Sequence, residues 1–152
     1  ALPISTVGSD GSYTELLVIP GGGTRTPLTV EGIAQKQDCI RMAGKEIFKL
    51  AVGNMLGSCN KVLQDSGKTV ADLRWLIPHQ ANTRIINAIG ERLEIPAEKV
   101  FINLHKYGNT SAASIPIALD EVVRSGQVDR GDYLLFTAFG GGLTWGATLW
   151  RW

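Results

Sequence analysis

Two short strings in the sequence carry side chains that can stabilise a developing negative charge on an oxygen atom. His79 lies in the string PHQAN at 78–82, and Asn109 lies in YGNTSAAS at 107–114. A third string, AFGGG at 138–142, predicts a turn with free backbone N–H groups around Gly141. An imidazole, a carboxamide and such a turn together can polarise a carbonyl group, as acyl transfer or carbon–carbon bond formation requires. The chain offers no equally convincing nucleophile.

The elements that must position these groups follow from the spacing of apolar residues. Helical spacing from about residue 42 to 65 predicts a helix that ends at Gly67. Asn82 can cap a second helix that runs to about residue 93, and a third is expected over about 111–124 with Pro116 in its early turns. Short apolar segments predict strands at 16–19, 75–77, 100–102, 133–139 and 144–152.

This alternation of strands and helices predicts an α/β fold, a sheet covered by helices, with residues 1–30 as a lead-in of strand and loop. His79, Asn109 and Gly141 each follow a predicted strand. In open α/β sheets, sites gather beyond the carboxyl ends of the strands. We therefore expect the three strings to meet at one rim of the sheet.

Composition narrows the class of protein. The chain has 152 residues, which suffices for one domain, and its net charge of +1 does not favour nucleic-acid binding. No apolar run approaches the ~20 residues of a membrane helix, and the first residues do not form a secretory signal. Because the sequence has no initiator Met, we expect further chain before it, or processing.

The cysteines and histidines show no spacing typical of a metal site. Cys39 and Cys59 are expected to be buried free thiols, which suits a reducing cytoplasm; spacing alone does not decide whether they form a disulfide. His105 is expected on a surface loop.

In combination, three phrases resemble the β-ketoacyl carrier-protein synthase III family of the thiolase superfamily. They are WLIPHQAN at 75–82, GNTSAAS at 108–114 and FGGGLTWG at 139–146. The likeness extends from about Gly8 to the last residue. It implies that residues 1–152 are the C-terminal half of a five-layer αβαβα fold with a mixed sheet, and that the N-terminal half, which carries the family's nucleophilic cysteine, is absent.

The resemblance implies a reaction and roles for individual residues. The family condenses acyl-coenzyme A with malonyl carrier protein, with release of carbon dioxide, and uses a coenzyme A thioester as substrate without a cofactor. His79 and Asn109 would hold the thioester oxygen of the enolate, and the Gly141 N–H would bind an oxyanion. Carrier-protein and coenzyme A contacts would come from Gln80, Ala81, Asn82, Thr83, Arg84, Gly44, Met42 and Phe48.

The same resemblance implies a cytoplasmic enzyme that is a homodimer when complete, with acyl carrier protein, acyl-CoA and its own N-terminal half as partners and no nucleic acid or membrane. This chain alone is expected to be inactive, because the acyl-carrying sulfur is missing. Two alternatives stay open: a carrier-protein or coenzyme A binding module without chemistry, and a related synthase of secondary metabolism.

Overall fold

Strands and helices alternate along most of the chain in a computed structural model, which describes residues 3–152. The strands are β1 (Ile4–Ser9), β2 (Leu17–Val18), β3 (Arg41–Met42), β4 (Leu73–Pro78), β5 (Tyr133–Gly140) and β6 (Thr144–Arg151). The α-helices are α1 (Val30–Ala34), α2 (Gly44–Ser66), α3 (Thr83–Arg92), α4 (Leu104–Tyr107) and α5 (Ser114–Arg124). Short 3-10 turns occupy Gly11–Leu16, Val70–Asp72, Ala97–Lys99 and Ser111–Ala113.

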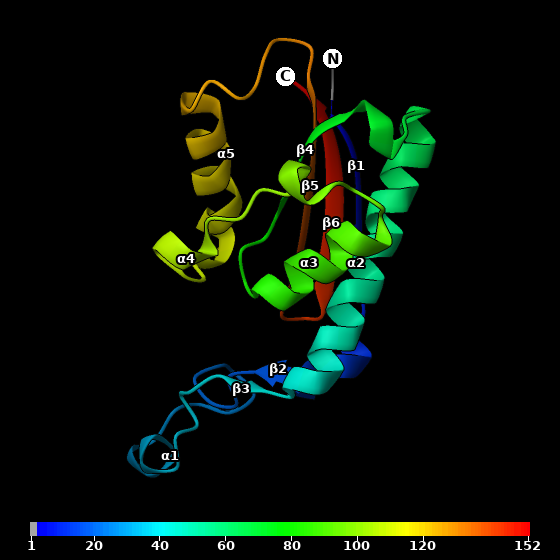
Figure 1. Ribbon diagram of the computed structural model, residues 1–152. Coiled ribbons are helices and arrows are strands. Elements are labelled where there is room, and N and C mark those ends of the chain that lie inside the picture. Colours follow the sequence, from blue (N-terminus) through cyan, green and yellow to red (C-terminus); the bar gives the residue numbers. More distant parts are fainter. Residues whose placement is uncertain (1–2) are drawn as a thin grey trace.

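The main sheet has the spatial order β1-β6-β5-β4. β4 and β5 run parallel, whereas β6 is antiparallel to both of its neighbours. Helices α2 and α3 cover one face and α5 covers part of the other (Figure 1). The predicted α/β class and mixed sheet are therefore confirmed, and the carboxyl ends of β4 and β5 lie side by side at one edge.

Local signals in the sequence explain where the helices begin and end. Gly67 adopts a left-handed φ of 62° directly after α2, a conformation that glycine adopts without strain. Asn82 caps α3, where its side-chain oxygen accepts a hydrogen bond from the Arg84 N–H. Pro116 lies within the first turn of α5, where its missing N–H costs no helical hydrogen bond.

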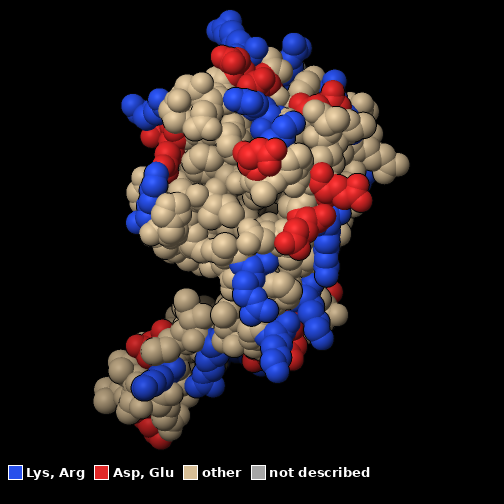
Figure 2. Space-filling model, viewed as in Figure 1, with Lys and Arg blue, Asp and Glu red and all other residues tan. Residues whose placement is uncertain are grey.

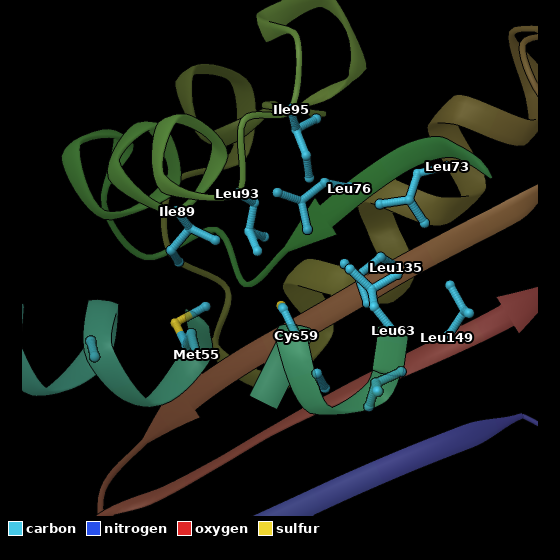
Figure 3. Packing of buried hydrophobic residues seen from close by; sticks show 13 residues of the cluster. Met55, Cys59, Leu63, Leu73, Leu76, Ile89, Leu93, Ile95, Leu135 and Leu149 are labelled. Atoms are coloured by element: carbon cyan, nitrogen blue, oxygen red, sulfur yellow. The ribbon is translucent and has the colours of Figure 1, made fainter. Parts of the chain in front are cut away.

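The hydrophobic core divides between the two faces of the sheet because successive strand residues point to opposite sides. On one face, Met55 and Cys59 of α2 and Ile89 of α3 pack against Leu76 and Leu135 (Figure 3). On the other face, Ala118 and Val122 of α5 pack against Ile77, Leu134 and Phe136. Both helical layers are thus fixed to the strands whose ends carry the candidate residues.

An arm extends from the main body between β2 and β3 and carries α1 at its far end (Figure 1). The two short strands at its base form a separate antiparallel pair. Several of its apolar side chains are exposed, including Val30, which is 87% exposed, and Ile40, which is 70% exposed. The arm therefore has little core of its own.

The strand predicted at 100–102 is wrong. Only Val100 forms an isolated bridge, to Leu76, and the chain turns away after Phe101 donates its N–H to the Leu76 oxygen. The predicted strand at 16–19 is shorter than expected, because the preceding residues form a 3-10 turn. Strand β1 was not predicted as an element of its own. Among the described residues, no helix has the length and apolarity needed to span a membrane.

Candidate functional site

His79 is the first residue after β4, and its backbone fixes it to the neighbouring strand. Pro78 pairs with Thr137 in the parallel register, and the His79 N–H donates to the Thr137 oxygen at 2.8 Å. The imidazole Nδ1 lies 2.6 Å from the Ser114 hydroxyl oxygen. Burial lowers the pKa of His79 below its usual value, which favours the neutral form of the ring. Its Nε2 has no partner within residues 3–152.

The structure contradicts the prediction that Gln80 contacts the carrier protein or coenzyme A, because this residue is buried. Its side chain is 1% exposed, with its amide nitrogen donating to the carbonyl oxygens of Pro78 and Phe101 at 2.9 and 3.1 Å. Its amide oxygen accepts from the N–H groups of Asn103 and Leu104 at 3.0 and 3.2 Å. All four hydrogen-bonding positions of the amide are therefore used to join the His79 loop to the chain that leads to Asn109.

Asn109 follows α4 on a loop whose geometry orients the carboxamide. The Ser111 N–H donates to the Asn109 side-chain oxygen at 2.9 Å. Because an N–H group donates only to an acceptor, the oxygen must occupy this position and the NH2 group is left free to donate elsewhere. Asn109 therefore presents a hydrogen-bond donor.

The loop before Asn109 is joined to α5 by a carboxylate. Glu121 accepts from the Asn103 side-chain amide at 2.9 Å and forms an ion pair with Lys106. These hydrogen bonds hold the pKa of Glu121 below its ordinary value. Asn103 is itself buried, so the loop that positions Asn109 is attached both to α5 and, through Gln80, to the end of β4.

The glycine turn joins β5 to β6 at the same end of the sheet. The N–H of Gly141 has no acceptor within the described part of the chain. Gly142 has a φ of 141°, which side-chain-bearing residues rarely adopt. The next residue, Leu143, is fully buried and exchanges two backbone hydrogen bonds with Asp10, both at 2.9 Å. The turn is thereby fixed to the end of β1.

A single large depression of about 1790 Å³ is lined by His79, Asn109 and Gly141 together. The three strings therefore meet at one rim. Other predicted site residues also line it: Gly44, Met42, Phe48, Ala81, Asn82 and Arg84. Thr83 is exposed and does not line the depression.

Basic side chains gather on one side of this depression. Lys45 and Lys49 project from the first turns of α2, and Arg84 is the second residue of α3. The Arg84 guanidinium lies over the Phe48 ring at 5.5 Å from its centroid, which brings the starts of the two helices together. One group of Lys and Arg side chains lies in the lower part of the main body, near the base of the arm, and others lie at the top of the main body (Figure 2).

Neither cysteine is suited to be a nucleophile at this site. Cys59 is buried in the core, and burial raises the pKa of its thiol to about 12. Cys39 is exposed on the arm, contrary to the prediction that it is buried, and does not line the depression. Both thiols are free. No group of metal-binding side chains occurs within residues 3–152, and His105 is exposed on α4.

Sequence reasoning missed one functional candidate, Ser114, and assigned the wrong role to another, Gln80. Ser114 stands in the same string as Asn109, but only the fold shows that its hydroxyl meets the His79 ring. The structural role of Gln80 likewise depends on a buried turn that has no sequence signature.

Comparisons with known proteins place the chain in a family. Residues 63–152 match the family described as 3-oxoacyl-[acyl-carrier-protein (ACP)] synthase III C terminal. A β-ketoacyl-[acyl-carrier-protein] synthase III from Desulfitobacterium hafniense is 51% identical over 96% of this chain. The chain spans 44% of that relative's length.

Solved structures agree with this match. The crystal structure of 3-oxoacyl-[acyl-carrier-protein] synthase III from Aquifex aeolicus is 48% identical with a TM-score of 0.84, over 98% of this chain and 44% of that one. The priming β-ketosynthase of the R1128 polyketide biosynthetic pathway is 32% identical with a TM-score of 0.82, over 97% of this chain and 43% of that one. The chain belongs to the 3-oxoacyl-[acyl-carrier-protein] synthase III family and corresponds to its C-terminal part.

Proposed function

We propose that residues 1–152 are the C-terminal half-domain of a β-ketoacyl carrier-protein synthase III that condenses an acyl-CoA primer with malonyl carrier protein. The observation that carries this proposal is the pair of neutral donors at one depression, His79 and Asn109. The Asn109 amide is oriented with its NH2 group free, and the His79 ring is neutral with Nε2 unpartnered among the described residues. Such a pair suits an oxygen on which negative charge develops.

The chemistry proceeds in two parts. The acyl group first passes from coenzyme A to a cysteine sulfur, and the Gly141 N–H stabilises the oxyanion of that transfer. The malonyl thioester then loses carbon dioxide, and the electron pair of the broken bond forms an enolate whose charge rests on the thioester oxygen. His79 and Asn109 donate to this oxygen; removal of one such donor typically raises a barrier by ~2.7–4 kcal/mol. The enolate carbon attacks the acyl carbonyl, and the cysteine leaves as thiolate, which takes up one proton.

The nucleophilic cysteine comes from an N-terminal half. Cys59 does not serve as this nucleophile, because burial raises the pKa of its thiol to about 12. Cys39 does not serve either, because it lies on the arm. The size of the depression, about 1790 Å³, supports a missing partner, because small-ligand pockets are typically ~300–1,000 Å³. Its lining includes Val7, which is 87% exposed on the edge strand β1. The 152-residue chain by itself is therefore inactive.

The basic side chains beside the depression receive the carrier protein. Lys45, Lys49 and Arg84 present positive charge near the cavity, and attraction to an acidic carrier protein speeds encounter. Ala81, Asn82, Gly44, Met42 and Phe48 would line the path of the pantetheine arm, whereas Thr83 and the buried Gln80 would not touch it. The enzyme needs no cofactor, acts in the cytoplasm and is a homodimer when complete.

A hybrid enzyme tests this proposal. The part of the Desulfitobacterium hafniense relative that this chain does not match is joined ahead of residues 1–152, and formation of β-ketoacyl carrier protein is measured with acetyl-CoA and malonyl carrier protein. We expect the hybrid to condense and the chain alone to be inactive. A folded hybrid without activity, alongside an active parent relative, would contradict the proposed reaction. Robust condensation by the chain alone would contradict the need for a second half.

A related secondary-metabolite synthase is the second candidate, favoured by the 32% identity to the R1128 priming β-ketosynthase. Comparison of the hybrid's rates with carrier proteins from fatty-acid and polyketide synthesis separates the two roles. A binding module without chemistry would need neither oriented donor, so its carrier-protein affinity would be unchanged in His79→Ala, and the hybrid would show no activity.

A further inference from the structure

Ser114 occupies a position that the proposed reaction does not itself explain. It is the first residue of α5, is 2% exposed, and places its hydroxyl oxygen 2.6 Å from His79 Nδ1. The same oxygen accepts a hydrogen bond from the Gln80 N–H at 3.2 Å. Within residues 3–152 the hydroxyl has no other partner.

The direction of the hydrogen bond to His79 follows from a count of donors and acceptors. A serine hydroxyl has one proton to donate and two lone pairs. The Gln80 N–H occupies a lone pair, so the hydroxyl proton needs an acceptor, and among residues 3–152 His79 Nδ1 is the only hydrogen-bonding partner that can accept it. If Nδ1 carried the ring proton instead, the buried serine proton would be left unpaired, which is costly.

We propose that Ser114 is a positioning residue that donates its proton to Nδ1 and holds neutral His79 as the Nε2–H tautomer. The nitrogen without a protein partner then carries the proton, so the ring offers a donor to the depression. The backbone bond from His79 to Thr137 fixes the position of the residue, and the Ser114 contact fixes the ring. That the Nε2–H group donates to an enolate oxygen rests on the proposed function. The assignment of the tautomer does not rest on it.

Nitrogen NMR of the imidazoles tests the tautomer in the unmodified chain. The chain is labelled with 15N, and long-range proton–nitrogen correlations are recorded at about pH 8, above the usual histidine pKa of ~6.5. The sequence has only two histidines, and His105→Gln assigns their signals. We expect His79 to show a protonated Nε2 and an unprotonated Nδ1 whose shift indicates an accepted hydrogen bond. A protonated Nδ1 would overturn the proposal.

Substitutions test whether Ser114 is the cause. Ser114→Ala should give averaged His79 nitrogen shifts from two exchanging tautomers, while Ser114→Thr, which keeps the hydroxyl, should retain the Nε2–H form. Ser125→Ala is the matched control, because its hydroxyl lies at the far end of the same helix and donates to the Val122 oxygen. A fixed Nε2–H form in folded Ser114→Ala would refute the role of the serine. If Ser114→Ala does not fold, loss of the Nε2–H form in folded Ser114→Thr would refute the role of the serine instead.

A kinetic arm separates this inference from the proposed reaction. In the hybrid enzyme, Ser114→Ala should lower kcat for malonyl decarboxylation roughly 10- to 100-fold with little change in KM, because misplacement of a catalytic group by about 1 Å can cost ~10²-fold. An altered tautomer with unchanged kcat would uphold the positioning role and contradict the enolate role of His79. An unchanged tautomer with a lowered kcat would overturn the positioning role.

Discussion

The buried Gln80 amide is the most sharply defined support of the site, and its replacement by the isosteric Met tests that support. Gln80→Met keeps the length of the side chain but removes four hydrogen bonds of 2.9–3.2 Å. At a net contribution of about 1 kcal/mol each, their loss should lower the free energy of unfolding by about 3–4 kcal/mol. For a chain of this length, that corresponds to a fall in Tm of roughly 6–16 °C.

Urea unfolding measures the loss of stability, and amide hydrogen exchange locates it. The N–H groups of Asn103 and Leu104 lose their acceptor in the variant and should exchange faster than other amides of the sheet. Gln64→Met is the matched control: Gln64 is exposed on α2 and should change stability by less than ~0.5 kcal/mol. A Gln80→Met loss below about 1 kcal/mol, with the two amides still protected, would refute the reasoning.

Three further predictions concern the ionisable groups. Burial lowers the pKa of His79 below its reference of 6.5, so the unfolded chain binds more protons, and the free energy of unfolding should fall as pH decreases from about 6.5 through the folded pKa. Unfolding curves at several pH values should show that this free energy depends less on pH in His79→Gln. An equal pH dependence in the variant would contradict the pKa shift. A thiol reagent should modify exposed Cys39 in the folded chain and Cys59 only after denaturant is added, as mass spectrometry of the labelled peptides would show; fast labelling of Cys59 would be inconsistent with its burial. In the hybrid, Arg84→Glu should raise KM for malonyl carrier protein several-fold at low salt, whereas Lys61→Glu, which changes an exposed ion pair on α2, should not. An equal rise in KM in the two variants would argue against a specific docking site.

The end of α2 and the start of α3 were predictable because they depend on neighbouring residues. The left-handed stop at Gly67 and the Asn82 cap act within a few positions, and both lie where the sequence indicates. The meeting of His79, Asn109 and Gly141 was also predicted, and His79 and Gly141 do follow strands β4 and β5. The strand expected before Asn109 does not form; the Gln80 amide instead holds the chain before Asn109 at the end of β4. The family resemblance rests on the same strings.

Long-range contacts account for what the sequence did not reveal. Strand β1 has little apolar alternation and is held as a strand by β6. The segment at 100–102 is apolar, yet only one bridge forms because the chain turns toward the Gln80 amide. The hydrogen bond between Ser114 and His79 joins residues 35 positions apart. The burial of Gln80 depends on the turn that follows residues 100–102. Such contacts follow from the fold rather than from local sequence.

Decarboxylation by the hybrid enzyme is the measurement that most directly tests the central claim, that His79 and Asn109 hold one thioester oxygen. Release of carbon dioxide from malonyl carrier protein is followed for His79→Ala, Asn109→Ala and the double variant, with exposed His105 and Asn87 changed to Ala as controls. Each single variant should lose ~10²–10³-fold in kcat, and the losses should not be additive, while acylation of the cysteine by acyl-CoA persists. Decarboxylation within about threefold of the parent hybrid in either single variant would contradict the claim.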